Sequence, residues 1–234
     1  MHLLWRCTTM AATSFLFSLT LHASVVVGLP AISGNGNCYP FGCGSALSTY
    51  QQIYTQTAFP GATNITGVDF FNTQVFNSPN LDTTGTYTLS LSYSSKLVGA
   101  LDTTNPTNNI SSGSQIVFSE PLPALSAGML DFKGTPFLYN PALGNLLLTV
   151  TVSGATNFGF STPVLFLDQA QTQSATSRAF FFTSGGSAGN DSGGLVTQFD
   201  SGTPGTPEPA TFSFGILGIG LIVLVGSGKK KIKH

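Results

Sequence analysis

Histidine is almost absent from this 234-residue sequence, which contains only His2, His22 and His234. Between residues 32 and 206 there is none. A serine nucleophile of the usual kind needs an imidazole to accept its proton, and zinc sites commonly use imidazole ligands. The absence therefore excludes Ser-His-Asp catalysis in this region and leaves no histidine to complete a zinc site.

Charged residues are also scarce, with 8 basic and 9 acidic residues in the whole chain. Between residues 32 and 206 three basic residues stand against eight acidic ones, which gives a net charge of −5. Nucleic-acid binding needs a basic surface that neutralises phosphates. We therefore expect no nucleic-acid partner for this region, whose length suffices for one domain with its own core.

Cysteine occurs three times, and Cys7 falls in a segment that we assign below to a signal peptide. Cys38 and Cys43 then remain, spaced C-x4-C around Tyr-Pro-Phe-Gly. Outside the cytoplasm such a pair is expected to form a disulfide, and a loop this small acts as a local clip. A metal site at these cysteines is the alternative, and it would need further ligands.

Long helical patterns are absent between residues 32 and 206, whereas alternation with a period of two is frequent. Tyr87, Leu89, Leu91 and Tyr93 alternate with Ser and Thr, and residues 146–153 repeat the pattern after a turn at Pro141–Asn145. Further strands are predicted at residues 65–71, 115–119, 128–132, 164–167, 178–183 and 195–199. The expected fold is an all-β, antiparallel β-sandwich over residues 32–201, jelly-roll-like in its connections.

Stretches rich in Gly, Asn and Ser interrupt this pattern. Ser33–Cys43 is expected to form an irregular cap, Gly185–Gly194 a flexible loop, and residues 202–206 a linker. The sequence Gly-Asn-Asp-Ser-Gly-Gly at 189–194 resembles the nucleophile segment of chymotrypsin-like serine proteases. Because no imidazole is available, we interpret this match as loop composition.

Asp82 and Asp102 both occur in the sequence Leu-Asp-Thr-Thr, with several asparagines nearby. Capping of turns by these side chains is one interpretation, and an oxygen-rich calcium site is the other. No other cofactor is predicted. Tyr39, Phe41, Tyr50, Tyr54 and Tyr139 either pack in the core or present flat faces to sugar rings.

The N-terminus has the layout of a secretory signal peptide. Arg6 precedes an apolar stretch from Met10 to Leu21, and small residues follow. The predicted signal peptide covers residues 1–23, and Gly28 and Ala31 are alternative cleavage sites. An uncleaved anchor is disfavoured by the shortness of the stretch.

The C-terminus combines three features in a fixed order. A Pro-Glu-Pro motif at Pro207, Glu208 and Pro209 precedes an apolar run over residues 212–228, at the lower length limit for a transmembrane helix. A basic tail follows, formed by Lys229, Lys230, Lys231 and Lys233, which favours a cytoplasmic location for the end of the chain. This order, over residues 207–234, resembles the PEP-CTERM sorting segment of bacteria. A plain membrane anchor would have the same orientation.

The resemblance implies that an exosortase is a partner, that the chain is its substrate, and that the protein is exported and anchored in the membrane at least transiently. The ectodomains of PEP-CTERM proteins are also resembled, by Tyr50, Gln51, Gln52 and Tyr54, then Ile65 and Phe70, then residues 135–148. They look like a family of unassigned biochemical role, which brings no catalytic residues. We therefore expect a non-enzymatic protein, secreted or at the cell surface, that contributes to the envelope or the extracellular polysaccharide matrix. A carbohydrate-binding, lectin-like module is the alternative, and a glycoside hydrolase using two carboxylates is ranked last.

Overall fold

The computed structural model describes residues 24–43, 47–74, 81, 83–155, 164–171, 174–183 and 188–202. The predicted signal peptide, the linker beyond Gly202 and the sorting segment lie outside these residues. The described chain is all-β. Its strands are β1 (Val25–Val27), β2 (Ala31–Asn37), β3 (Leu47–Tyr54), β4 (Thr63–Phe71), β5 (Thr86–Ser94), β6 (Ser112–Glu120), β7 (Leu125–Ser126), β8 (Met129–Tyr139), β9 (Asn145–Ser153), β10 (Leu167–Ala170), β11 (Thr176–Phe182), β12 (Gly189–Asp191) and β13 (Thr197–Ser201).

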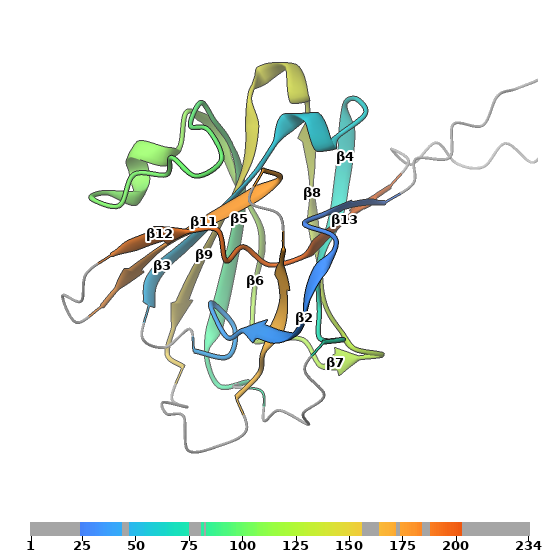
Figure 1. Ribbon diagram of the computed structural model, residues 1–234, viewed down its shortest axis with the longest axis vertical. Helices are drawn as coiled ribbons and strands as arrows, with labels where there is room; N and C mark the ends of the chain where they lie inside the picture. Colours follow the sequence, from blue (N-terminus) through green and yellow to red (C-terminus); the bar gives the residue numbers. More distant parts are fainter. Residues whose placement is uncertain are drawn as a thin grey trace, which may run out of the picture.

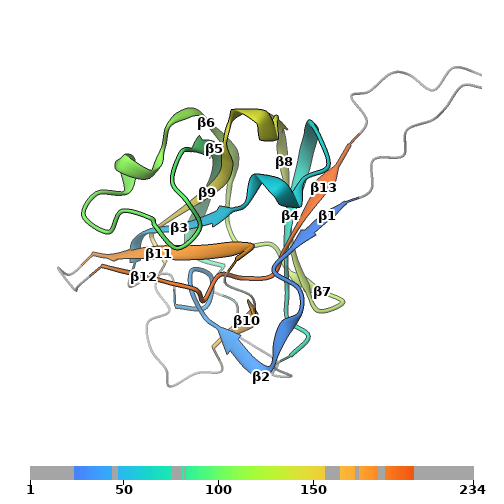
Figure 2. The ribbon, with the colours of Figure 1, turned by 45° about the horizontal axis from the view of Figure 1, so that its top comes forward.

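Two large antiparallel sheets form a sandwich-like arrangement (Figures 1 and 2). One sheet has the strand order β1-β13-β4-β8-β7, and the other has the order β12-β11-β3-β9-β5-β6. A third, two-stranded sheet pairs β10 with β2. The predicted all-β, antiparallel class is therefore confirmed.

The alternation predicted for residues 86–93 and 146–153 places one set of side chains between the two large sheets. Tyr87, Leu89 and Leu91 of β5 are at most 1% exposed, and Leu146 and Leu148 of β9 are fully buried. They join one apolar cluster with residues of the five-stranded sheet, such as those of β4 and β8. Period-two burial of this kind is what fixes the register of a strand that has one face in the core.

A second, smaller core covers the opposite face of the six-stranded sheet. Ile53 of β3 and Leu147 of β9 are fully buried there, together with Leu101. Leu101 belongs to the segment between β5 and β6, which contains a 3₁₀ helix at Pro106–Asn109 and runs beside β3 and β11 (green in Figure 2). This cover explains why Leu147, on the predicted outer face, is apolar.

The two large sheets approach each other closely where β6 passes β8. A Cβ atom added to Gly134 of β8 would lie 1.8 Å from the carbonyl oxygen of Val117 in β6. No side chain fits between backbones at that separation. Glycine at position 134 is therefore a requirement of the fold.

Some strand predictions need correction. Residues 33–37 belong to β2, and Gly189–Asp191 forms β12, although the sequence predicted an irregular cap and a loop there. The strand predicted at 164–167 instead runs from Leu167 to Ala170, and β3 and β7 were not predicted. The pairing of β2 and β12 depends on backbone hydrogen bonds, which any composition can supply, so their side chains give no period-two signal.

The sheet begins before the predicted start of the ectodomain at residue 32. β1 pairs with β13 in the register Val25↔Phe199 and Val27↔Thr197, and Val27 is 2% exposed. Because the two strands are antiparallel, both ends of the described chain lie at the same corner of the molecule (Figure 1). Cleavage at Ala23 would leave β1 intact, whereas cleavage at Gly28 or Ala31 would remove it.

Candidate functional site

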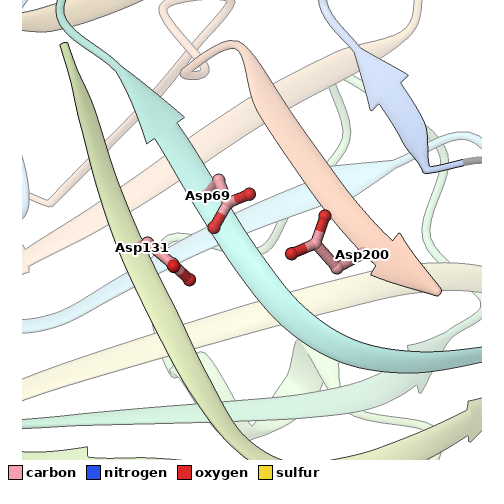
Figure 3. Close-up of side chains that lie close together, drawn as sticks. All are labelled: Asp69, Asp131 and Asp200. Carbon is pink, nitrogen blue, oxygen red and sulfur yellow. The ribbon is translucent and has the colours of Figure 1, made fainter. Parts of the chain in front are cut away.

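Three aspartates gather on the outer face of the five-stranded sheet (Figure 3). Asp69 lies in β4, Asp131 in β8 and Asp200 in β13. Asp69 and Asp131 each stand between two apolar residues that point into the core, and Asp200 follows one. Because successive side chains of a strand point to opposite faces, each carboxylate lies on the outer face. Asp69 and Asp131 are direct cross-strand partners, while Gln198 of β13 faces Asp69 from the other side.

The three carboxyl groups lie close together, with Asp69 between the other two (Figure 3). One oxygen from each lies within 4.8 Å of the others. The Gln198 amide nitrogen donates to Asp69 Oδ2 at 3.0 Å and to Asp200 Oδ1 at 2.9 Å. Lys133 Nζ lies 2.7 Å from Asp131 Oδ2, on a side chain that is 71% exposed.

Two carboxylate oxygens in this cluster are buried without a hydrogen-bond donor among the described residues, namely Oδ1 of Asp69 and Oδ1 of Asp131. Asp69 as a whole is 1% exposed. Burial raises the pKa of Asp69 to about 7, and the carboxyl groups of Asp131 and Asp200 act in the same direction, against the hydrogen bond from Gln198. Such a cluster can share a proton or hold a cation.

The calcium ligands considered from the sequence, Asp82 and Asp102, are not part of this cluster. Asp82 lies outside the described residues. The Asp102 carboxylate accepts hydrogen bonds from the backbone and hydroxyl of Thr104, the backbone of Asn105 and the amide of Asn108, at 2.6 to 3.1 Å. These hydrogen bonds, that to the Thr104 hydroxyl first, lower the pKa of Asp102, which is the chemistry of a turn cap.

A partial signal for the cluster was present in the sequence. Asp69 stands between Val68 and Phe70, and Asp131 stands between Leu130 and Phe132. On a strand with one buried face, each of these carboxylates must therefore point away from the core. The pairing of those strands was not visible. Without it, the sequence could not show that the two outward carboxylates are neighbours.

Most of the aromatic residues considered as sugar platforms are core residues. Phe41, Tyr50, Tyr54 and Tyr139 are at most 2% exposed. Tyr39 differs, because it is only half-buried and its ring stacks on Phe180 of β11 at 5.8 Å between centroids. Phe182 contacts both rings edge-on.

Beside these rings lies the ion pair between Arg178 and Asp191. The Arg178 Nε and Nη2 atoms donate to the two oxygens of Asp191 at 2.6 and 3.0 Å. The guanidinium also lies 5.4 Å from the centre of the Phe180 ring. Burial alone would raise the pKa of Asp191, but Arg178 outweighs that effect and lowers it. The carboxylate in the protease-like segment therefore pairs with a guanidinium.

A shallow cleft of about 370 Å³ lies elsewhere, near the 3₁₀ helix at Gln56–Ala58. Its lining includes polar residues such as Thr55, Ser94 and Asn145, together with the exposed Leu97. Asn145 is engaged in holding the cleft wall, because its side-chain oxygen accepts from the Gln56 backbone and its amide donates to Lys96. The cleft offers hydroxyl and amide groups but no aromatic platform.

The predicted disulfide is present, with the Cα atoms of Cys38 and Cys43 5.3 Å apart. It closes a turn in which the backbone nitrogens of Gly42 and Cys43 donate to the Cys38 carbonyl oxygen. Phe41 at the tip of this turn lies in the core against Phe70 and Phe132. The disulfide is therefore a clip that anchors one end of the core.

The residues of the sorting motif and of the basic tail lie outside the described part of the chain. Among the residues that the structure describes, no helix is both long and apolar enough to cross a membrane. Comparison of the chain with protein-family models, with curated proteins and with solved structures found no match.

Proposed function

We propose that this chain is a non-catalytic protein of the bacterial cell surface, exported and then sorted by an exosortase through its C-terminal segment. It contributes to the envelope or to the extracellular polysaccharide matrix. Connections that pass repeatedly between the two large sheets, from β3 to β4, β4 to β5 and β8 to β9, support a jelly-roll-like sandwich. The Cys38–Cys43 disulfide supports an oxidising compartment.

The observation that carries this proposal is where the last described strand ends. Among the described residues this strand, β13, ends at Ser201, and the Gly202 backbone nitrogen still donates to the Asn64 carbonyl oxygen at 3.1 Å. The Pro-Glu-Pro motif begins at Pro207, only a short linker further on. Cleavage near the motif would therefore leave all the described strands intact and remove the apolar run and the basic tail.

Mass spectrometry of surface material tests the processing step. The full chain is expressed in a bacterium that produces an exosortase, and the C-terminal peptide of the surface form is identified. We expect a mature chain that lacks Lys229–Lys233. The variant Glu208→Ala should retain the tail and stay in the membrane fraction, whereas Pro204→Ala, in the linker, should be processed normally. A surface form that still contains the lysines would support a plain membrane anchor instead.

Carbohydrate binding is the second candidate, and one observation favours it. Tyr39 and Phe180 present half-buried rings next to the Arg178–Asp191 ion pair. A flat apolar ring beside fixed donors and acceptors is a common way to hold a sugar.

A binding experiment separates this candidate from a purely structural role. The full chain is incubated with extracellular polysaccharide from the native host, and bound protein is measured over a concentration series. Saturable binding that Tyr39→Ala abolishes and Leu97→Ala preserves would establish a lectin-like module, since Leu97 is an exposed apolar residue away from the rings. If both variants bind the polysaccharide equally well, or if the wild type does not bind it, the surface around Tyr39 is not a carbohydrate-binding site.

A further inference from the structure

We propose that Asp69, Asp131 and Asp200 bind one calcium ion on the outer face of the five-stranded sheet. The three residues come from three adjacent strands, β4, β8 and β13, which hydrogen-bond to one another. The ligand positions are therefore set by paired backbone and need no loop to close over them.

The spacing of the carboxylate oxygens fits a single calcium ion. One oxygen from each aspartate lies within 4.8 Å of the others. Calcium binds oxygen at about 2.3 to 2.6 Å, so one ion between these atoms can contact all three, with water completing its shell. Magnesium needs near-ideal octahedral geometry at about 2.0 to 2.1 Å and gives up its waters reluctantly, so a set of carboxylates fixed on paired strands suits it less well.

The charges of the cluster also call for a cation. Three carboxylates face one ammonium group, that of Lys133, so the local charge is −2 when all four groups are ionised. A divalent cation would neutralise this charge. A proton shared between Asp69 and Asp131 would neutralise only half of this charge.

Two buried oxygens of the cluster also lack a hydrogen-bond donor among the residues that the structure describes. Oδ1 of Asp69 and Oδ1 of Asp131 have no hydrogen-bond partner in the described part of the chain, and Asp69 is 1% exposed. Elsewhere this fold satisfies a buried aspartate fully. Asp168, 3% exposed, accepts from the Thr73 backbone and hydroxyl and from the Gln74 backbone. A cation ligated by the two Oδ1 atoms would remove the cost of leaving them bare.

Neighbouring residues hold the carboxylates without blocking the ion. Gln198 binds Asp69 through Oδ2, the other oxygen, and so leaves Oδ1 free. Gly67 faces Asp200 across the strand pair, and a Cβ atom there would lie 3.1 Å from Asp200 Oδ2. Glycine thus leaves room beside Asp200 for its carboxylate.

A calcium titration of the purified full chain tests this site. Bound metal is first removed with a chelator, and calcium chloride is added while the thermal unfolding midpoint and the heat of binding are followed. We expect one ion per chain with a dissociation constant of about 0.1 to 1 mM, the range of weak extracellular calcium modules. Magnesium should bind at least about tenfold more weakly, because its bonds to oxygen are shorter.

Three isosteric variants show where the ion binds. Asp69→Asn and Asp200→Asn should each weaken calcium binding at least about tenfold, since each removes one anionic ligand. Asp102→Asn should bind calcium like the wild type. If Asp69→Asn fails to fold, Asp200→Asn decides, because Asp200 is half-buried and lies nearer the edge of the sheet.

Either of two results would overturn the proposal. The first is a wild-type chain whose midpoint and heat signal do not respond to about 10 mM calcium, far above the expected dissociation constant. In that case the cluster shares a proton and takes no ion. The second is a calcium response that survives in both Asp69→Asn and Asp200→Asn, which would place the ion elsewhere.

Discussion

The side chain of Gln52 links the two large sheets, and replacing it with leucine should destabilise the fold strongly. Gln52 lies in β3 of the six-stranded sheet and is fully buried. Its Oε1 atom accepts from the Leu195 backbone at 2.9 Å and from the Tyr50 hydroxyl at 2.6 Å. Its Nε2 atom donates to the Leu195 carbonyl at 2.8 Å. Leu195 leads directly into β13 of the five-stranded sheet.

The expected loss follows from the groups left without partners. Gln52→Leu has a similar volume, but it removes the acceptor of two buried donors, the Leu195 N–H and the Tyr50 hydroxyl. Each unsatisfied buried group costs about 1 to 3 kcal/mol. The Leu195 carbonyl keeps its bond from Thr197 Oγ1 at 3.0 Å, so it adds little. Burial of the leucine side chain offsets part of the cost, and we expect a net loss of about 3 kcal/mol.

Chemical denaturation followed by far-UV circular dichroism measures this loss. For a domain of this size, about 3 kcal/mol corresponds to a fall of about 6 to 12 °C in the thermal midpoint. Tyr50→Phe is the matched control, because it removes one hydroxyl and leaves the Leu195 bonds in place, and it should cost about 1 kcal/mol. A Gln52→Leu variant within about 0.5 kcal/mol of the wild type would show that the bridge between the sheets is not needed.

Three further predictions concern separate features of the fold. Gly134→Ala should lower the free energy of unfolding by about 2 kcal/mol or more in denaturation experiments, because the added Cβ would meet the backbone of β6. The control Gly61→Ala, at a position with open space around it, should change the free energy of unfolding by less than about 0.5 kcal/mol. Replacing both cysteines of the Cys38–Cys43 pair with alanine should cost about 2 kcal/mol, the loop-closure value for so short a loop, and no loss would refute a stabilising clip. Asp191, with a pKa lowered by Arg178, stabilises the fold above its unfolded pKa, so this contribution should disappear as the pH falls below about 4. Asp191→Asn should flatten that part of the pH–stability curve by no more than about 1 kcal/mol, because the Asp191 side chain is 44% exposed.

Local patterns in the sequence were sufficient for the strands that bury one face. The alternation in β5 and β9 predicted both elements and the side chains that enter the core, because burial imposes a period of two on the sequence. The close spacing of Cys38 and Cys43 likewise predicted their disulfide. These features depend on residues that are near one another in the chain.

The acidic cluster could not be predicted in the same way, because it depends on long-range pairing. Asp69, Asp131 and Asp200 are more than 60 residues apart along the chain, and they meet only because β4 pairs with both β8 and β13. A shift of one residue in either register would turn a carboxylate away from its neighbours or into the core. Asp102, by contrast, was a candidate calcium ligand because asparagines lie near it in the sequence, and those asparagines belong to the turn that Asp102 caps.

The disulfide and the proposed calcium site both depend on the surroundings of the folded chain. Cys38 and Cys43 oxidise only where thiols are not kept reduced. A calcium site with a dissociation constant of about 0.1 to 1 mM fills only where calcium is abundant, as it is in extracellular fluids. The disulfide fixes the turn that carries Phe41 into the core, while the ion would tie β13 to β4 and β8 just before the chain leaves for the linker. If the chain is exported as proposed, both features would therefore form only outside the cytoplasm, and the sandwich would reach its full stability there.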